Sequence, residues 1–551
     1  MKNNDWTTTL SEQLYKVSRW GEGYFEINEK GHMTVNPDEG ETRIDMIKVV
    51  EEMKAKGVEF PAVIRFHDIL WSKVIQLNQS FQKTIKEEGY EGTYRGVYPI
   101  KVNQMREVVE EIIASGEPFD FGLEAGSIAE LLAVLAFNTN ENSLTVLNGY
   151  KDKQYMRLAM MGRKMGREII VVIERISELD LILNVAQEFG VKPLIGVRSK
   201  LSIQSVGKWK DSSGERAKFG LSVSEILKVT NSLKEKGFLD CFKLLHFHIG
   251  SQITDIRSIK ESINEATRIY SRLYQMGVGV DTIDVGGGLG VDYDGTRSTN
   301  SSSKNYSLEE YVADVVYGIK EVCNLENVPH PDIVSESGRA LTAQHSCVVT
   351  EVIDVIDPIE SLYKMHKENN EHHLVKSARY IYENITSENF QEYYNDILKV
   401  KEDTLNSFRL GILNLEQRAK VETYAIETLK KISELIQSAE FVPDEFWAIG
   451  NRLAPQYLCN FSVFQSAADH WAIDQILPVV PLQRLGEKPD IEATLVDITC
   501  DSDGKMCQFT GSQEDQSTLK VHSLIKDENY YLGIFLTGAY QDVMGDMHNL
   551  F

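Results

Sequence analysis

A lysine ends a short apolar stretch in the segment GVYPIKVNQ, residues 96–104. Val97 and Ile100 suit a buried strand, and Pro99 excludes a helix. A lysine at a strand end commonly reaches solvent and does nothing more. A lysine held in a partly dry site can instead be a nucleophile that forms a Schiff base. Lys101 is therefore a candidate catalytic residue, although this segment alone does not decide between the two roles.

Three consecutive glycines occur in DVGGGLGVDYDG, residues 284–295. A dinucleotide-binding fingerprint needs a glycine at position 291, which is Val291, and a helix where the loop TRSTNSSSKN follows. Glycine amides after a late barrel strand can cradle one phosphate, and the alternative is a plain tight turn. A strand-end lysine together with a phosphate cradle predicts pyridoxal phosphate.

Two other strand ends carry side chains that this cofactor needs. A carboxylate must keep its ring nitrogen protonated, and Glu336 in SESGRAL stands at a strand end with Arg339 three residues later. In HFHIGSQ, strand alternation sends His246 and His248 to the same side, with Ser251 beyond the strand. One histidine is expected to lie against the ring, and Ser251 to bind phosphate; the alternative for a lone histidine is a place in the core.

The elements around these residues alternate between strands and helices. Stretches such as MREVVEEIIAS and IAELLAVLAF have helical periodicity. Repeated strand and helix units of this length predict a closed (β/α)8 TIM-type barrel with its chemistry at the carboxyl ends of the strands. The predicted strands, from about residue 60 to 345, are PAVIRF, GVYPIK, FDFGLE, LTVLNG, EIIVVIE, PLIGVR, LLHFHIG, TIDVGGG and DIVSESG.

The later part of the chain has a different pattern. Residues 387–440 contain one glycine, no proline and apolar residues at three- and four-residue steps, which indicates an inserted helical hairpin or small bundle. After residue 445, the segments WAIDQILPVV, ATLVDIT, STLKVHSLI and YYLGIFLTGAY predict strands of a mainly β domain. The predicted domains are an N-terminal segment packed on the β domain (1–60), a pyridoxal phosphate-binding barrel (61–345), and the β domain (346–551) with a helical insertion at about 360–445.

Composition narrows the class of partner. Acidic residues number 82 against 58 basic ones, which gives a formal net charge of -24. Such a surface repels nucleic acid and anionic membranes but attracts a cationic substrate. The six cysteines lack CxxC spacing, which favours reduced thiols, and no apolar segment resembles a signal or a membrane span. We therefore expect a cytoplasmic protein.

Seven motifs in chain order resemble one known family. They are YPIKVNQ, FGLEAGS, HFHIGSQ, DVGGGLGVDYDGT, ESGRALTAQHS, ITCDSDGK and GAYQDVMGDMHNLF. The chain resembles the biosynthetic arginine decarboxylases, pyridoxal phosphate-dependent lyases of the alanine-racemase-like group. The resemblance implies decarboxylation of L-arginine to agmatine and CO2 through a Schiff base, in the route to putrescine and spermidine.

The resemblance also assigns roles to individual residues. The implied catalytic residues are Lys101, His248 and Cys500. The implied cofactor-binding residues are Lys101, Glu124, His248, Ser251, Gly286, Gly287, Gly288, Glu336, Arg339 and Tyr540. The implied substrate-binding residues are Ile283, Asp284, Val285, Gly286, Gly287, Gly288, Leu289, Gly290, Val291, Asp292, Tyr293, Cys500 and Asp501.

Cys500 lies in the polar loop CDSDG, where a thiol of ordinary acidity would be protonated and able to act as an acid. A buried core cysteine is the alternative. Asp501 is the implied partner of the substrate's cationic end, whereas Asp503 before Gly504 suits a turn. In related enzymes this loop enters the neighbouring subunit's site, so the resemblance implies a homodimer or larger oligomer with shared sites.

Other features of the resemblance remain open. Magnesium is possible by resemblance, but the residues indicate no magnesium ligands. Ile128 and Ala129 stand where much of the family has a Lys-Pro pair, and family members usually continue beyond MHNLF. The residues alone do not separate arginine from ornithine or diaminopimelate as substrate, nor an enzyme from a catalytically silent relative.

Overall fold

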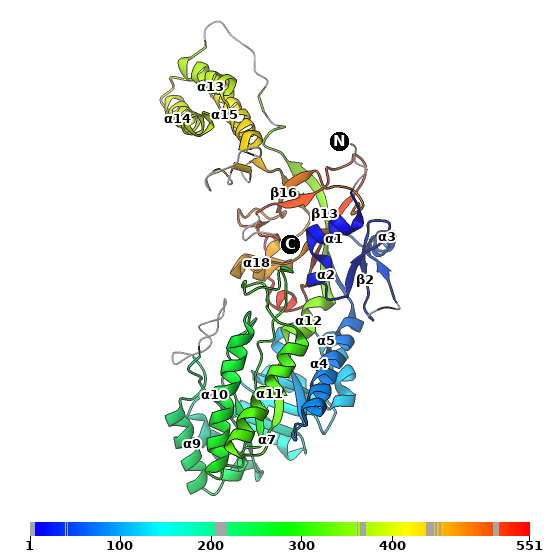
Figure 1. Ribbon diagram of the computed structural model, residues 1–551, viewed down its shortest axis with the longest axis vertical. Coiled ribbons are helices and arrows are strands. Elements are labelled where there is room, and N and C mark those ends of the chain that lie inside the picture. Colours follow the sequence, from blue (N-terminus) through cyan, green and yellow to red (C-terminus); the bar gives the residue numbers. More distant parts are fainter. Residues whose placement is uncertain are drawn as a thin grey trace.

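A computed structural model describes residues 6–38, 40, 42–203, 218–360, 362–363, 371–436, 446, 449–450, 453–510 and 517–551. The molecule is elongated and has three parts: a barrel at one end, a β domain in the middle and a helical bundle at the other end (Figure 1). Within these described ranges, a helix with the length and apolar character needed for a bilayer crossing does not occur.

The barrel is closed, and its eight strands are parallel in the order β10-β11-β12-β5-β6-β7-β8-β9. Its interior is filled by apolar side chains such as Val146, Val172 and Leu244, as expected for strands buried on both faces. The strands are β5 (Tyr94–Pro99), β6 (Gly122–Ala125), β7 (Leu144–Leu147), β8 (Glu168–Ile173), β9 (Leu194–Arg198), β10 (Phe242–His246), β11 (Thr282–Asp284) and β12 (Asp332–Ser335). The predicted TIM-type barrel is confirmed.

Helices surround this barrel and bury one apolar face each against the strands. The helices are α4 (His67–Glu88), α5 (Arg106–Gly116), α6 (Ile128–Phe137), α7 (Lys153–Lys164), α8 (Glu178–Phe189), α9 (Val223–Glu235), α10 (Ile256–Gln275) and α11 (Leu308–Glu326). The start of α6 is intact despite the absence of Lys-Pro, because the Ser127 hydroxyl accepts a hydrogen bond from the Glu130 amide.

The β domain is built on the long strand β13 (Ser346–Ile356), which pairs with β4, β14 and β19. The other strands of this domain are β4 (Ala62–Arg65), β14 (Gln456–Cys459), β15 (Val479–Pro481), β16 (Ile491–Val496), β17 (Lys505–Met506), β18 (Leu519–Val521) and β19 (Tyr530–Phe535). Short helices here and at the barrel rim are α12 (Arg339–Thr342), α17 (Val463–Ser466), α18 (Ala468–Ile473) and α19 (Gln541–Met544).

Two predicted strands are wrong in detail. PAVIRF contains β4, which pairs antiparallel with β13 and so belongs to the β domain rather than to the barrel. WAIDQILPVV is helical at its start, in α18, and only its end forms β15. Both segments are apolar enough for a strand, and the partner that each finds in the tertiary structure decides the outcome.

The N-terminal segment packs against the β domain. Its elements are α1 (Thr8–Tyr15), α2 (Val17–Trp20), β1 (Phe25–Ile27), β2 (Met33–Val35), β3 (Ile44–Asp45) and α3 (Met46–Ala55). The Tyr15 hydroxyl donates to the Lys520 carbonyl at 2.6 Å, and the Trp20 ring lies 5.2 Å from that of Phe535.

The helical insertion contains α13 (His373–Asn384), α14 (Phe390–Arg409) and α15 (Leu415–Ile436). Ile397, Val421 and Ala425 form part of a core of its own, separate from that of the barrel. The bundle projects from the β domain, and its helices lie far from the barrel (Figure 1). The predicted run reaches residue 440, and its last four positions lie outside the described residues.

Candidate active site

A cavity of about 380 Å³ opens at the carboxyl ends of the barrel strands. Every barrel strand contributes to its wall from its last residues or from the loop that follows. The contributors in strand order are Lys101, Glu124, Asn148, Glu174, Arg198, His246 with His248, Gly287 with Gly288, and Glu336. Tyr540 reaches the same cavity from the β domain. This is the end at which barrel enzymes carry their chemistry.

Lys101 lies in the turn η1 (Ile100–Val102), which directly follows β5. Ile100 and Val102 are buried, whereas 48% of the Lys101 side chain is exposed and lines the cavity. Its Nζ donates to Glu124 Oε2 at 3.0 Å. Burial lowers the pKa of Lys101, but the carboxylates of Glu124 and Glu336 outweigh it, so the pKa lies above its ordinary value. The resting amine is therefore cationic and forms an ion pair with the Glu124 carboxylate.

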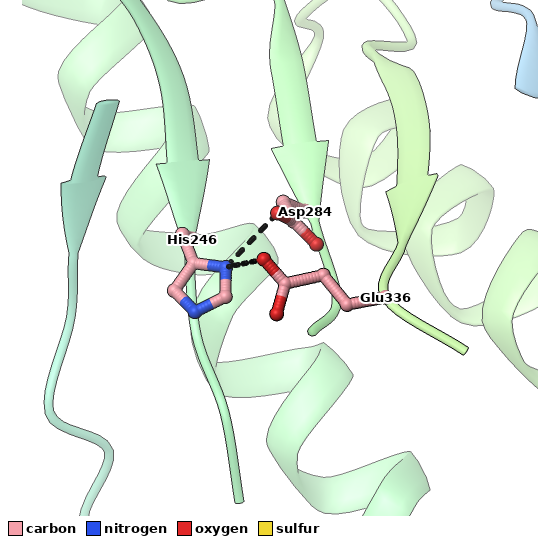
Figure 2. Close-up of side chains that lie close together, drawn as sticks. All are labelled: His246, Asp284 and Glu336. Carbon is pink, nitrogen blue, oxygen red and sulfur yellow. Dashed lines mark ion pairs between the residues drawn. The ribbon is translucent and has the colours of Figure 1, made fainter. Parts of the chain in front are cut away.

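Glu336 follows β12 and belongs to a buried polar cluster with His246 and Asp284 (Figure 2). His246 Nδ1 lies 3.0 Å from Asp284 Oδ2 and 3.7 Å from Glu336 Oε1. The Asn148 amide donates to Glu336 Oε1 at 2.6 Å and to Glu124 Oε1 at 3.1 Å. Asn148 thus joins the carboxylate beside Lys101 to the carboxylate of the cluster.

Burial governs the ionisation of this cluster. It raises the pKa of Asp284 to about 7, and burial together with the neighbouring Asp284 raises the pKa of Glu336 to about 8. Burial also lowers the pKa of His246. If the protonated ring nitrogen of a bound ligand lay against Glu336, its positive charge would favour the ionised form of the Glu336 carboxyl group.

The glycine-rich segment after β11 packs closely against the segment that follows β10. Gly286 has φ +66° and Gly288 has φ +114°, and a Cβ on Gly286 would lie 2.3 Å from the Phe247 carbonyl oxygen. A Cβ on Gly288 would approach Ile253 and the Gly250 carbonyl at about 3.0 Å. Only glycine suits these positions, which explains the motif.

The cationic side chain of Arg339 lies close to this glycine-rich turn. Arg339 is buried and donates from Nη2 to Ser251 Oγ at 3.4 Å and from Nη1 to Tyr293 Oη at 2.9 Å. The Arg339 guanidinium carbon lies 4.9 Å from the Tyr540 ring centre. Arg339, Ser251 and the cavity-lining glycines form a positively charged, polar recess of the kind that binds phosphate.

His248 is held as a neutral imidazole. Burial and the nearby Arg198 lower its pKa well below its ordinary value. Its Nδ1 accepts a hydrogen bond from the Gly287 amide at 3.2 Å, so the ring hydrogen of the neutral form is on Nε2. A fixed, uncharged ring in the cavity wall suits stacking on an aromatic ligand.

These groups fit pyridoxal phosphate. One cavity is lined by all the groups that this cofactor needs. They are an amine for its aldehyde, a carboxyl group for its ring nitrogen, a neutral ring for its face and a cationic recess for its phosphate.

The predicted substrate segment, residues 283–293, is divided by the fold. Gly287, Gly288 and Leu289 line the active-site cavity. Leu289 to Asp292 line a larger cavity of about 670 Å³ beside the N-terminal helices, where Glu22 forms ion pairs with Lys73 and Lys304. Ile283 is a core residue, and Tyr293 binds Arg339. The contact of this segment with substrate stays a prediction.

Cys500 and Asp501 lie in the loop between β16 and β17 of the β domain. Cys500 is exposed, and its amide donates to Asn549 Oδ1 at 2.9 Å. Asp501 Oδ1 accepts from the Asp503 amide at 2.9 Å, so the turn contact is made by the side chain of Asp501 and not by that of Asp503, for which it was expected. Neither residue is in the wall of the Lys101 cavity. Their roles as acid and substrate partner stay predictions.

Sequence reasoning missed four polar residues of the cavity, which are Glu130, Asn148, Glu174 and Arg198. Arg198 donates from Nη1 to Glu174 Oε1 at 2.6 Å, and Lys151 lies 3.6 Å from Glu174 Oε2. Asn148 bridges two carboxylates, as described above. Their positions could have indicated a role in the site, because Asn148, Glu174 and Arg198 stand at the ends of strands that the sequence predicts.

Metal ligands are scarce in the described part of the chain. The group of His, Cys, Asp or Glu residues close enough to hold an ion there is His246, Asp284 and Glu336. This buried set includes a nitrogen donor, whereas magnesium prefers oxygen ligands and retained water, so the set does not fit magnesium.

Comparison with known proteins identifies the class first. Residues 72–343 match the family model described as pyridoxal-dependent decarboxylase, pyridoxal binding domain, and residues 368–448 match the arginine decarboxylase helical bundle domain. The crystal structure of a diaminopimelate decarboxylase from Helicobacter pylori has a TM-score of 0.56 at 16% identity, covering 91% of each chain, and so shares the fold. The barrel and its cavity are those of a pyridoxal-dependent decarboxylase.

Closer relatives identify the family. The chain is 46% identical to a biosynthetic arginine decarboxylase of Gloeobacter violaceus over 99% of this chain and 85% of that protein. It is 45% identical to one of Deinococcus radiodurans over 100% of this chain and 83% of that protein. The crystal structure of the Campylobacter jejuni biosynthetic arginine decarboxylase has a TM-score of 0.84 at 34% identity, covering 98% of this chain and 86% of that one. The chain belongs to the biosynthetic arginine decarboxylase family.

Proposed function

We propose that this chain decarboxylates L-arginine to agmatine and CO2, with pyridoxal phosphate held on Lys101, and so supplies putrescine and spermidine synthesis. The observation that carries the proposal is the Lys101–Glu124 pair at 3.0 Å in a cavity to which all eight barrel strands contribute, in a chain of this family. The matched helical bundle model, whose name refers to arginine decarboxylase, supports arginine over other amino acids.

When bound, pyridoxal phosphate supplies an aldehyde for an amine and a ring that accepts the electron pair left by departing CO2. Glu124 accepts the proton that the Lys101 amine must lose before it can act as a nucleophile. In the bound state, Glu336 would pair with the ring nitrogen, Arg339 and Ser251 would hold the phosphate, and His248 would cover one face of the ring. These side chains bind and orient, which is the protein's share of the catalysis.

Cys500 is the proposed proton donor to the α-carbon, and Asp501 is the proposed partner of the guanidinium. A carboxylate pairs with a planar guanidinium through two parallel hydrogen bonds. Because both residues lie outside the Lys101 cavity of their own chain, we propose that they act in the site of a second copy, in a homodimer or larger assembly. We place this assembly in the cytoplasm.

Carbon dioxide release tests the substrate assignment. The purified chain with added pyridoxal phosphate is assayed on labelled arginine, ornithine, lysine and diaminopimelate. We expect arginine to react at least about 100-fold faster, since a site built to pair a polar group rejects substrates that lack it. Equal rates on all four would overturn the arginine assignment. A protein that binds the cofactor and releases no CO2 from any of them would be a catalytically silent relative.

A further inference from the structure

In the wall of the cavity, one imidazole nitrogen faces two buried carboxyl groups. Asp284, His246 and Glu336 are 0%, 1% and 6% exposed, and they extend from the neighbouring strands β11, β10 and β12 (Figure 2). The contacts are 3.0 Å from His246 Nδ1 to Asp284 Oδ2 and 3.7 Å to Glu336 Oε1. Because these side chains are almost fully buried, charges within the cluster must be balanced mainly by neighbouring protein groups.

The hydrogen bonds of the cluster are incomplete. Asp284 Oδ1 accepts from the Gly286 amide at 2.8 Å, and Glu336 Oε1 accepts from Asn148 at 2.6 Å. By contrast, Asp284 Oδ2 and His246 Nδ1 face each other without a hydrogen bond of good geometry. A buried carboxylate oxygen without a donor is costly, and a proton held within the cluster removes that cost.

The surrounding charges do not balance both carboxylates. The titratable groups that act on the cluster from the packed elements are Tyr94, Lys101, Glu124, Glu174, Arg198, His248 and Tyr311. Lys101 is already paired with Glu124, and Arg198 with Glu174. Two ionised carboxylates in the cluster would therefore lack a cation of their own.

We infer that Asp284, His246 and Glu336 share one proton, and that Asp284 and His246 are positioning residues that allow Glu336 to pass this proton to the ring nitrogen of the cofactor. The inference rests on the proposed function. Before the cofactor binds, the proton keeps one carboxyl group neutral. On binding, the O–H bond breaks and an N–H bond forms, so Glu336 becomes the carboxylate that faces the protonated ring. The raised pKa values of Asp284 and Glu336 agree with a retained proton.

Calorimetry of cofactor binding tests this inference. The apoprotein is titrated with pyridoxal phosphate at pH 7.5 in two buffers of different ionisation enthalpy, which counts the protons exchanged. In the Asp284→Asn variant Glu336 loses its repelling neighbour and is ionised beforehand. We therefore expect this variant to take up about one more proton from the buffer than the wild-type protein does.

Asp281→Asn is the matched control. Asp281 precedes the same strand at its other end, is 60% exposed and pairs with Lys243, so its loss leaves the wild-type proton count unchanged. An unchanged count in Asp284→Asn would overturn the inference, because a purely structural Asp284 would alter affinity without altering proton exchange. A wild-type protein that does not bind the cofactor would refute the proposed function instead.

Infrared spectroscopy of the wild-type apoprotein tests the shared proton without a cofactor or a variant. We expect a protonated carboxyl band that persists at pH 7, above the range in which ordinary carboxyl groups ionise. Its absence at pH 7 would overturn the inference, as would one tightly bound metal ion per chain that is lost in His246→Asn.

Discussion

The two halves of the proposed active site differ in how complete they are within one chain. The barrel half, around Lys101 and Glu336, is hydrogen-bonded and assembled from all eight strands. The other half, Cys500 and Asp501, lies in an exposed loop of the β domain. Among the described residues, its side-chain contacts are within the loop and to Asn549 and His548. One half is preorganised by the fold, whereas the other lies outside the Lys101 cavity of its own chain.

This difference corresponds to two tasks, which are cofactor binding and the delivery of an acid with selection of the substrate. Cofactor binding needs fixed geometry, which rigid strand ends provide. Delivery of an acid and selection of a substrate can come from a loop, and a loop from a second subunit couples catalysis to assembly. The following predictions test that division.

Replacement of Lys101 should have the largest effect. Lys101→Ala removes the amine that anchors the cofactor, and we expect arginine decarboxylation to fall by about 10³-fold or more. The measurement is labelled CO2 release with saturating pyridoxal phosphate. Lys153→Ala, at the exposed start of α7, is the control, and the protein with this substitution should decarboxylate arginine as the wild-type protein does. An active Lys101→Ala protein would show that the barrel half does not carry the chemistry.

Replacement of Cys500 should slow the reaction less. Cys500→Ala removes the proposed proton donor but leaves the barrel half intact, so we expect a loss of about 10²-fold and unchanged cofactor binding. Product analysis should also reveal incorrectly protonated products. Cys507→Ala, a second thiol that is half-buried next to the short strand β17, is the matched control. Equal effects of the two substitutions would remove Cys500 from the mechanism.

Mixing the two variants tests whether the two halves of the site come from different copies. If Lys101→Ala and Cys500→Ala subunits exchange, half of the resulting dimers contain one intact composite site. We expect recovery of up to about a quarter of wild-type activity, measured after equilibration of equal amounts. No recovery in mixtures shown to contain heterodimers would place both halves of the site in one chain.

The smallest expected effect concerns apoprotein stability and pH. Asp284 and Glu336 have pKa values raised to about 7 and about 8, so the folded state binds protons that the unfolded state releases. Their contribution is fully present below about pH 4 and is lost as pH rises through 7 and 8. Asp284→Asn should therefore lose less stability between pH 6 and 8.5, by on the order of 2 kcal/mol, seen as a smaller fall in Tm. A fall equal to that of the wild-type apoprotein would contradict this assignment.

The sequence predicted the barrel because each strand and helix signals its own type locally. The helical insertion and most strands of the β domain were predictable for the same reason. The PAVIRF segment failed because its composition suits either sheet, and pairing with β13 is a long-range event. Local pattern does not encode that choice.

The site was predictable where one residue type has an unusual position, as with Lys101 at a strand end and the three glycines after β11. Asn148 and Arg198 are ordinary polar residues at ordinary strand ends. Their roles arise from Glu124, Glu174 and Glu336, which come from other strands. Such bridges depend on the closed barrel, so only the structure reveals them.

Chemical trapping of the cofactor tests the central claim most directly. The purified chain is loaded with pyridoxal phosphate, reduced with borohydride, digested and mapped by mass spectrometry. The account predicts one cofactor mass added to the peptide that contains Lys101, and no addition at that position in Lys101→Ala. A label fixed to a different lysine, or none in a protein that decarboxylates arginine, would contradict it.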